Sequence, residues 1–152
     1  MKKLFTLVAC LVTLNATFAQ WVYKTVDNGI DIPYKIAYSM DKENKAVLKL
    51  EKTDEGIAFY VTGGYFCDEY FNVDISILVN NQYKKYSLAA YKSSDSKTVF
   101  LIDNLLDFDK SDFLADFKKG SSLVMRINES HCDSEYYRFN ITNSSSAIQF
   151  MR

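Results

Sequence analysis

The stretch from Ile57 to Tyr91 constrains the fold of this chain more than any other. Between positions 71 and 79, every odd position carries a large apolar residue, while positions 72, 74 and 76 are polar. A period of two residues is typical of a β-strand that buries one face and exposes the other. We therefore predict that this stretch forms the centre of an antiparallel sheet.

Two predicted turns agree with that pattern. Asp54-Glu55-Gly56 and Asn80-Asn81 each separate two apolar runs, and Asn and Gly tolerate the positive φ angles of tight hairpin turns. A turn at each place sets apolar residues opposite one another on a single face. The predicted pairs are Leu48 with Val61, Leu50 with Phe59, Val73 with Leu88 and Ile75 with Tyr86.

The rest of the chain adds further strands and a helix. Alternating or continuous apolar segments predict strands at 20–27, 32–40, 98–102, 123–127 and 137–141. The strand at 32–40 places its larger side chains on one face: Tyr34, Ile36, Tyr38 and Met40. Between Asp107 and Gly120 the period becomes helical, with Phe113, Leu114 and Phe117 on one face and Ser111 as a candidate cap. Positions 144–151 can form a terminal helical turn.

These elements predict an all-β fold with a single domain over residues 20–152. About eight or nine short strands at this spacing indicate a mostly antiparallel β-sandwich or barrel with one short inserted helix. The Gly63-Gly64 pair interrupts a strand and indicates either a bulge or a close approach of another backbone or a ligand.

The first nineteen residues have the pattern of a secretory signal peptide. Two lysines precede an apolar run from Leu4 to Leu14, and the sequence Ala16-Thr17-Phe18-Ala19, with small residues at 17 and 19, suggests cleavage near Ala19, before Gln20. A membrane anchor and a lipidated Cys10 are the alternatives. The apolar run is too short for a stable transmembrane helix. We expect a periplasmic or secreted protein.

Charge argues against a nucleic-acid partner. The chain has 18 basic and 19 acidic residues, and loss of residues 1–19 removes two lysines, which leaves 16 − 19 = −3. Such a chain lacks the basic surface that neutralises phosphates.

Two cysteines, Cys67 and Cys132, would remain after export. In exported domains such a pair usually forms a disulfide, and this 65-residue loop would contribute about 4 kcal/mol to stability. A redox or metal site is the alternative, but Cys67 lacks a CxxC partner and a single His cannot complete a zinc tetrad. We predict no metal and no cofactor.

The residue pattern does not predict an enzyme. His131 has Ser130, Asp133 and Ser134 as neighbours, but adjacent loop residues rarely converge as a catalytic triad, so we expect an exposed His beside the disulfide. The acidic stretch that starts at Asp107 begins like a calcium-binding loop. Its sixth position is Asp112 and its twelfth is Lys118, where an EF-hand needs Gly and Glu.

Outward tyrosines and arginines form the candidate binding surface. Exposed aromatic residues stack on sugars and anchor protein interfaces, and Arg126 and Arg138 can pair with Glu129 and Glu135 or bind a ligand. The candidate residues are Tyr60, Tyr65, Tyr70, Tyr83, Tyr91, Tyr136, Arg126 and Arg138.

The mature chain resembles small exported bacterial β-sandwich proteins, namely the invasion-associated locus B family and the VasI-type accessory proteins of type VI secretion. Short motifs carry the resemblance: Trp21, Leu48 with Leu50, Phe100-Leu101, Met125-Arg126-Ile127, Phe139-Asn140-Ile141 and Ser146-Ala147-Ile148. The chain differs from these families in its widely separated cysteines. The resemblance implies no catalytic residues.

Together these features favour a non-catalytic domain that contacts another envelope or secreted protein. A glycan- or small-ligand-binding module that uses the tyrosines is the alternative.

Overall fold

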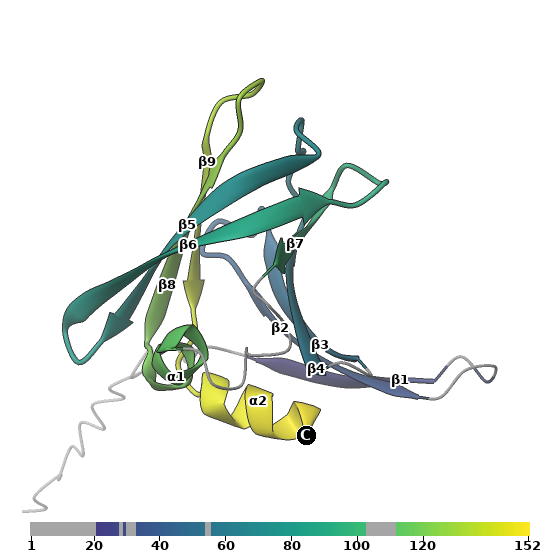
Figure 1. Ribbon diagram of the computed structural model, residues 1–152. Coiled ribbons are helices and arrows are strands. Elements are labelled where there is room, and N and C mark those ends of the chain that lie inside the picture. The colour runs from purple at the N-terminus through teal and green to yellow at the C-terminus, as the bar shows by residue number, and fades with distance from the viewer. Residues whose placement is uncertain (1–20, 28, 30–32, 54–55, 103–111) are drawn as a thin grey trace, which may run out of the picture.

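A single nine-stranded antiparallel sheet dominates the structure, a computed structural model that describes residues 21–27, 29, 33–53, 56–102 and 112–152 (Figure 1). The elements are β1 (Val22–Val26), β2 (Tyr34–Met40), β3 (Val47–Thr53), β4 (Gly56–Thr62), β5 (Tyr70–Val79), β6 (Gln82–Lys92), β7 (Thr98–Ile102), α1 (Asp112–Lys119), β8 (Ser122–Asn128), β9 (Glu135–Asn140) and α2 (Ser144–Met151). The strand order is β1-β2-β3-β4-β7-β6-β5-β8-β9. The predicted antiparallel all-β class is confirmed.

The sheet curls until its last strand meets its second. Asp41, just after β2, forms a bridge with Phe139 of β9, and the Lys42 N–H donates to the Arg138 carbonyl at 3.0 Å. The Ser39 hydroxyl donates to the Asn140 carbonyl at 3.2 Å. We call this junction the seam. Of the two predicted architectures, one continuous curled sheet corresponds to the barrel and not to two stacked sheets.

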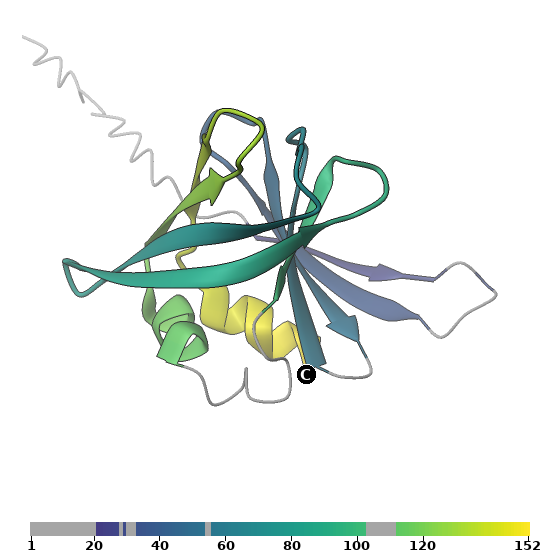
Figure 2. The same ribbon diagram turned by 45° about the horizontal axis from the view of Figure 1, so that its top comes forward.

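Helices α1 and α2 lie side by side at one end of the curled sheet and cover it (Figures 1 and 2). In α1 the three predicted residues, Phe113, Leu114 and Phe117, are buried. The Phe117 ring meets the Phe59 ring edge-on, with centroids 5.2 Å apart, and the Trp21 ring at 6.2 Å. One continuous hydrophobic core therefore joins the inner face of the sheet to the helices.

The second helix exceeds the terminal turn predicted from the sequence. Ala147, Ile148 and Met151 of α2 are buried, and the helix packs on β2 and β3. Gly120 ends α1 as predicted, in a place where a Cβ atom would lie 2.5 Å from Ile77 Cγ2.

The predicted registers are confirmed. The four apolar pairs expected from the two turns all lie directly opposite each other. Asn80 and Asn81 have φ angles of 48° and 63°, as a two-residue hairpin turn requires.

In β2 the inner face is not the face with the larger side chains. Ala37 and Ser39 point inward, opposite Leu50 and Leu48, whereas Met40 is exposed. Small inward residues leave room for α2, which packs against this strand.

Several predictions concern residues outside the described part of the chain. These are the signal peptide at 1–19 with its cleavage near Ala19, and the acidic stretch and cap at 107–111. Neither described helix is long and apolar enough to cross a membrane.

Candidate functional site

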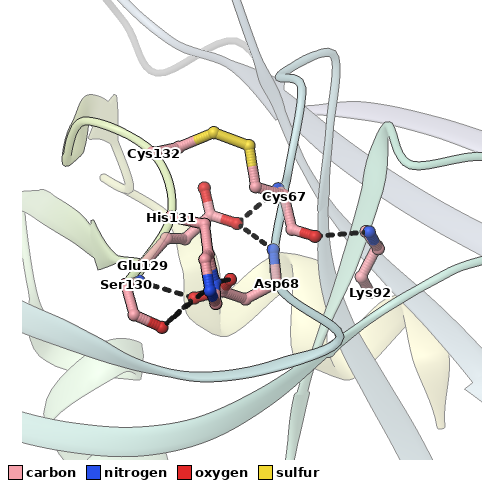
Figure 3. Close-up of a disulfide and its surroundings, with 7 residues drawn as sticks. All are labelled: Cys67, Asp68, Lys92, Glu129, Ser130, His131 and Cys132. Atoms are coloured by element: carbon pink, nitrogen blue, oxygen red, sulfur yellow. Dashed lines mark hydrogen bonds and ion pairs between the residues drawn. A yellow bond between two sulfur atoms is a disulfide. The ribbon is translucent and has the colours of Figure 1, made fainter.

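The disulfide forms as predicted and joins two loops at the end of the sheet opposite the helices (Figures 1 and 3). Cys67 follows β4 and Cys132 lies between β8 and β9, with their Cα atoms 6.1 Å apart. The Lys92 ammonium donates to the Cys67 carbonyl at 2.7 Å and ties β6 to the same loop.

Glu129 orders the chain beside the disulfide instead of pairing with an arginine. Its Oε1 accepts the backbone N–H groups of Cys67 at 2.6 Å and Asp68 at 2.9 Å. A carboxylate oxygen of Glu129 also lies within 4.8 Å of both sulfur atoms. Because these sulfur atoms are bonded to each other, they offer no thiolate to a metal ion.

The Asp68 carboxylate holds the loop between β8 and β9 through Ser130 and His131 (Figure 3). Its Oδ2 accepts the Ser130 N–H at 2.5 Å and the Ser130 hydroxyl at 2.7 Å, and its Oδ1 lies 2.5 Å from His131 Nδ1. The bond from the Ser130 backbone N–H, followed by that from His131, lowers the pKa of Asp68 to about 2. We call this group the clasp.

The clasp does not have the geometry of a catalytic triad. In a triad the serine and the carboxylate bind opposite nitrogens of the imidazole ring. Here the Ser130 hydroxyl donates to Asp68 and lies 3.5 Å from Nδ1, the same nitrogen that contacts Asp68. The His131 side chain is 81% exposed, as predicted, and its carboxylate partner is Asp68 rather than Asp133.

Five of the six candidate tyrosines are exposed, from 38% for Tyr91 to 70% for Tyr70. Tyr60 is the exception at 5%, and its prediction as a surface residue is wrong. It does point away from the core, but the Lys49 ammonium lies 4.7 Å from its ring centroid on the neighbouring strand. An outward position on a curled sheet can therefore still be covered.

The exposed tyrosines do not form one patch. Tyr70 and Tyr91 lie opposite each other, whereas Tyr136 is level with Asp74, four residues further along β5. Tyr83 is level with Leu78, another four residues on. At about 3.3 Å per residue, each step is about 13 Å.

A groove of about 510 Å³ runs over the outer face of β5, β6 and β8 and reaches Tyr136 of β9. Within it Asp74 accepts the Ser87 hydroxyl at 3.0 Å and the Asn128 amide at 2.8 Å. The Arg126 guanidinium lies 5.6 Å from the Tyr136 ring centroid, close enough for a cation–π interaction.

Arg126 and Arg138 are exposed on the outer face, as predicted. Their predicted partners serve other groups: Glu129 caps the Cys67 loop, and Glu135 accepts the Tyr137 hydroxyl. Lys85 is also exposed, and it lies in register with Arg138 across strands β6, β5, β8 and β9. We call Asp74, Lys85, Arg126, Tyr136 and Arg138 the outer band.

The close approach of neighbouring groups, and not a β-bulge, explains why glycine occupies positions 63 and 64. Gly63 has a φ of 109°, and a Cβ atom there would lie 2.6 Å from the Lys45 carbonyl oxygen. A Cβ atom on Gly64 would overlap the Tyr137 hydroxyl and lie 2.7 Å from Phe66 Cζ. The backbone at this corner therefore lies directly against its neighbours.

Sequence reasoning missed the partners that organise this end of the molecule. Asp68 and Ser130 are 62 positions apart, and the sequence contains no local signal that would join them.

Comparison with known proteins adds no relative: no family model, curated protein or solved structure matches this chain. The resemblance to the two families of exported proteins therefore remains a prediction.

Proposed function

We propose that this protein is a non-catalytic, exported binding domain that contacts another envelope or secreted protein through the outer band. The exposed Arg126–Tyr136 pair beside the groove carries the proposal. Arg and Tyr are among the residues that most often dominate the energy of protein interfaces.

The interior of the sheet supports a role for the outer surface. Inward side chains of the strands and of both helices form one hydrophobic core, in which Phe59, Phe113 and Phe117 pack ring against ring. Contacts to a partner therefore fall on the outer face and the loops.

The charge of the outer band indicates what the partner presents. Three basic residues, Lys85, Arg126 and Arg138, accompany one acid, Asp74, whose carboxylate already accepts two hydrogen bonds. The band thus has a net charge of 3 − 1 = +2 on a chain whose predicted mature charge is −3. A partner with an acidic surface is complementary to it.

The test is retention of a partner from bacterial envelope extract on the immobilised protein, followed by identification and a binding measurement. Arg126→Glu and Lys85→Glu should each weaken binding at least about tenfold, and binding should fall as salt rises because these charges are exposed. Lys24→Glu makes the same charge change on exposed β1 and should leave binding unchanged. Failure to retain a partner, or equal losses in all three variants, would count against the proposal.

An accessory role in the bacterial envelope, as in the two families that the chain resembles, is part of the same proposal. Detection of the protein in the periplasm or medium, with a mature chain that starts at Gln20, tests the predicted export. Retention in the cytoplasm would contradict it.

A further inference from the structure

We propose that the seam of the curled sheet carries a binding site for a neutral saccharide, between the end of β4 and the start of β9. A pocket of about 540 Å³ lies there, and its lining includes Lys45, Gly63, Tyr65, Glu135, Tyr136 and Tyr137. This site goes beyond the proposed protein contact, because most of its residues lie outside the outer band.

The pocket exists because the seam closes along part of β9 and not along all of it. Arg138 and Asn140 direct their carbonyl groups to the seam, where they accept from Lys42 and Ser39. Every second residue of a strand points its N–H and C=O to the same edge. The N–H and C=O of Tyr136 therefore also point to the seam, where no backbone group of the described chain pairs with them. A ligand hydroxyl can bind both groups.

Tyr65 forms one wall of the pocket on a loop that is already fixed. The next residue, Phe66, is fully buried, and its N–H donates to the Ser96 carbonyl at 2.9 Å. Cys67 then ties the loop to Cys132. The backbone that presents Tyr65 thus loses little conformational entropy when a ligand binds.

Tyr136 forms a second wall, and its ring is also held in place. The guanidinium of Arg126 lies 5.6 Å from the ring centroid. Both Tyr65 and Tyr136 are more than 60% exposed. An exposed aromatic ring suits the C–H face of a pyranose, while the sugar hydroxyls reach the polar groups beside it.

The polar groups of the pocket favour an uncharged ligand with many hydroxyls. Glu135 Oε2 accepts the Tyr137 hydroxyl, so Oε1 can accept from a sugar hydroxyl. Burial, and then the nearby charge of Glu129, raises the pKa of Glu135, while Lys45 opposes this. The Lys45 ammonium lies 2.5 Å from Glu43. Lys45 is thus paired with Glu43, and Glu135 with the Tyr137 hydroxyl, so neither charged group requires an oppositely charged group on the ligand.

The experiment uses protein purified from the periplasm, so that the disulfide forms. Isothermal titration with cellohexaose, maltohexaose, xylohexaose and N-acetylchitohexaose should find at least one that binds with a Kd of about 1 mM or tighter. Backbone amide signals at 63–65 and 135–137 should shift during the titration. Tyr65→Ala and Glu135→Gln should each weaken binding, Tyr65→Ala by about tenfold.

Tyr83→Ala is the matched control, because Tyr83 is exposed to a similar extent but lies beside the turn of the β5–β6 hairpin. It should bind as the wild type does, and thermal unfolding should show that all variants are folded. The proposal is overturned if no hexasaccharide binds, if Tyr83→Ala loses as much as Tyr65→Ala, or if only charged probes such as polygalacturonate fragments or a lysine peptide bind. Lys85→Glu should keep saccharide binding and weaken binding of the protein partner, which separates the two proposals.

Discussion

Truncation of Phe117 should remove the central contact between α1 and the sheet. Its side chain is fully buried, and its ring contacts those of Phe59 at 5.2 Å, Phe113 at 6.1 Å and Trp21 at 6.2 Å. Replacement of a buried Phe by Ala in a core costs about 3–5 kcal/mol. Since domains of this size are stable by about 5–15 kcal/mol, we expect Phe117→Ala to lose a large share of the free energy of unfolding.

The chain contains its own probe for this experiment. Trp21 is the single tryptophan, is buried, and lies beside Phe117, so its fluorescence reports on this part of the core. Urea unfolding followed by Trp21 fluorescence and by circular dichroism should give coincident transitions in the wild type. Lys119→Ala, an exposed change in the same helix, should cost less than about 1 kcal/mol.

A double-mutant cycle isolates the contact itself. Phe59→Leu and Phe117→Leu should couple by about 0.5–1.5 kcal/mol, the usual value of an edge-to-face aromatic pair. A loss below about 1 kcal/mol for Phe117→Ala, or a coupling near zero, would show that α1 does not pack on the inner face of the sheet through this residue.

Three further predictions test the disulfide, the glycine corner and the clasp. The double variant Cys67→Ser/Cys132→Ser should lower the free energy of unfolding by about 4 kcal/mol, because its 65-residue loop is no longer closed; equal stability in urea would refute this. Gly64→Ala should cost about 1–3 kcal/mol, because its Cβ would overlap the Tyr137 hydroxyl. Gly29→Ala should cost about 1 kcal/mol, because its Cβ atom meets open space and only the φ of 72° is unfavourable. If Gly29→Ala cost more than Gly64→Ala, the close packing around Gly64 would be contradicted. The pKa of Asp68, lowered to about 2 from 3.8, means that the clasp stabilises fully above pH 3.8 and is lost as the pH falls toward 2. An NMR titration should find the pKa of Asp68 raised in His131→Ala. An unchanged pKa would show that His131 does not stabilise the Asp68 carboxylate.

The local architecture could be predicted because it depends on neighbouring residues. The alternation from 71 to 79 sets which face of β5 is buried, and Asn80-Asn81 sets its register with β6. The helical period around Phe113 and Phe117 likewise identified the buried face of α1. The disulfide could be predicted from the expectation of export and from the two cysteines that would remain after it.

The sites could not be predicted in the same way, because they depend on which distant strands meet. The seam between Asp41 and Phe139 forms only when the whole sheet curls, and the pocket beside Tyr136 exists because the seam closes in part. Tyr60 is a different case: its position opposite Lys49 follows from the predicted register of β3 and β4, but alternation does not indicate that the Lys49 side chain lies over the Tyr60 ring. Alternation in a sequence determines the side of a strand on which a residue lies. Whether that residue is exposed, or what it binds, is decided by the curvature that brings its non-local neighbours to it.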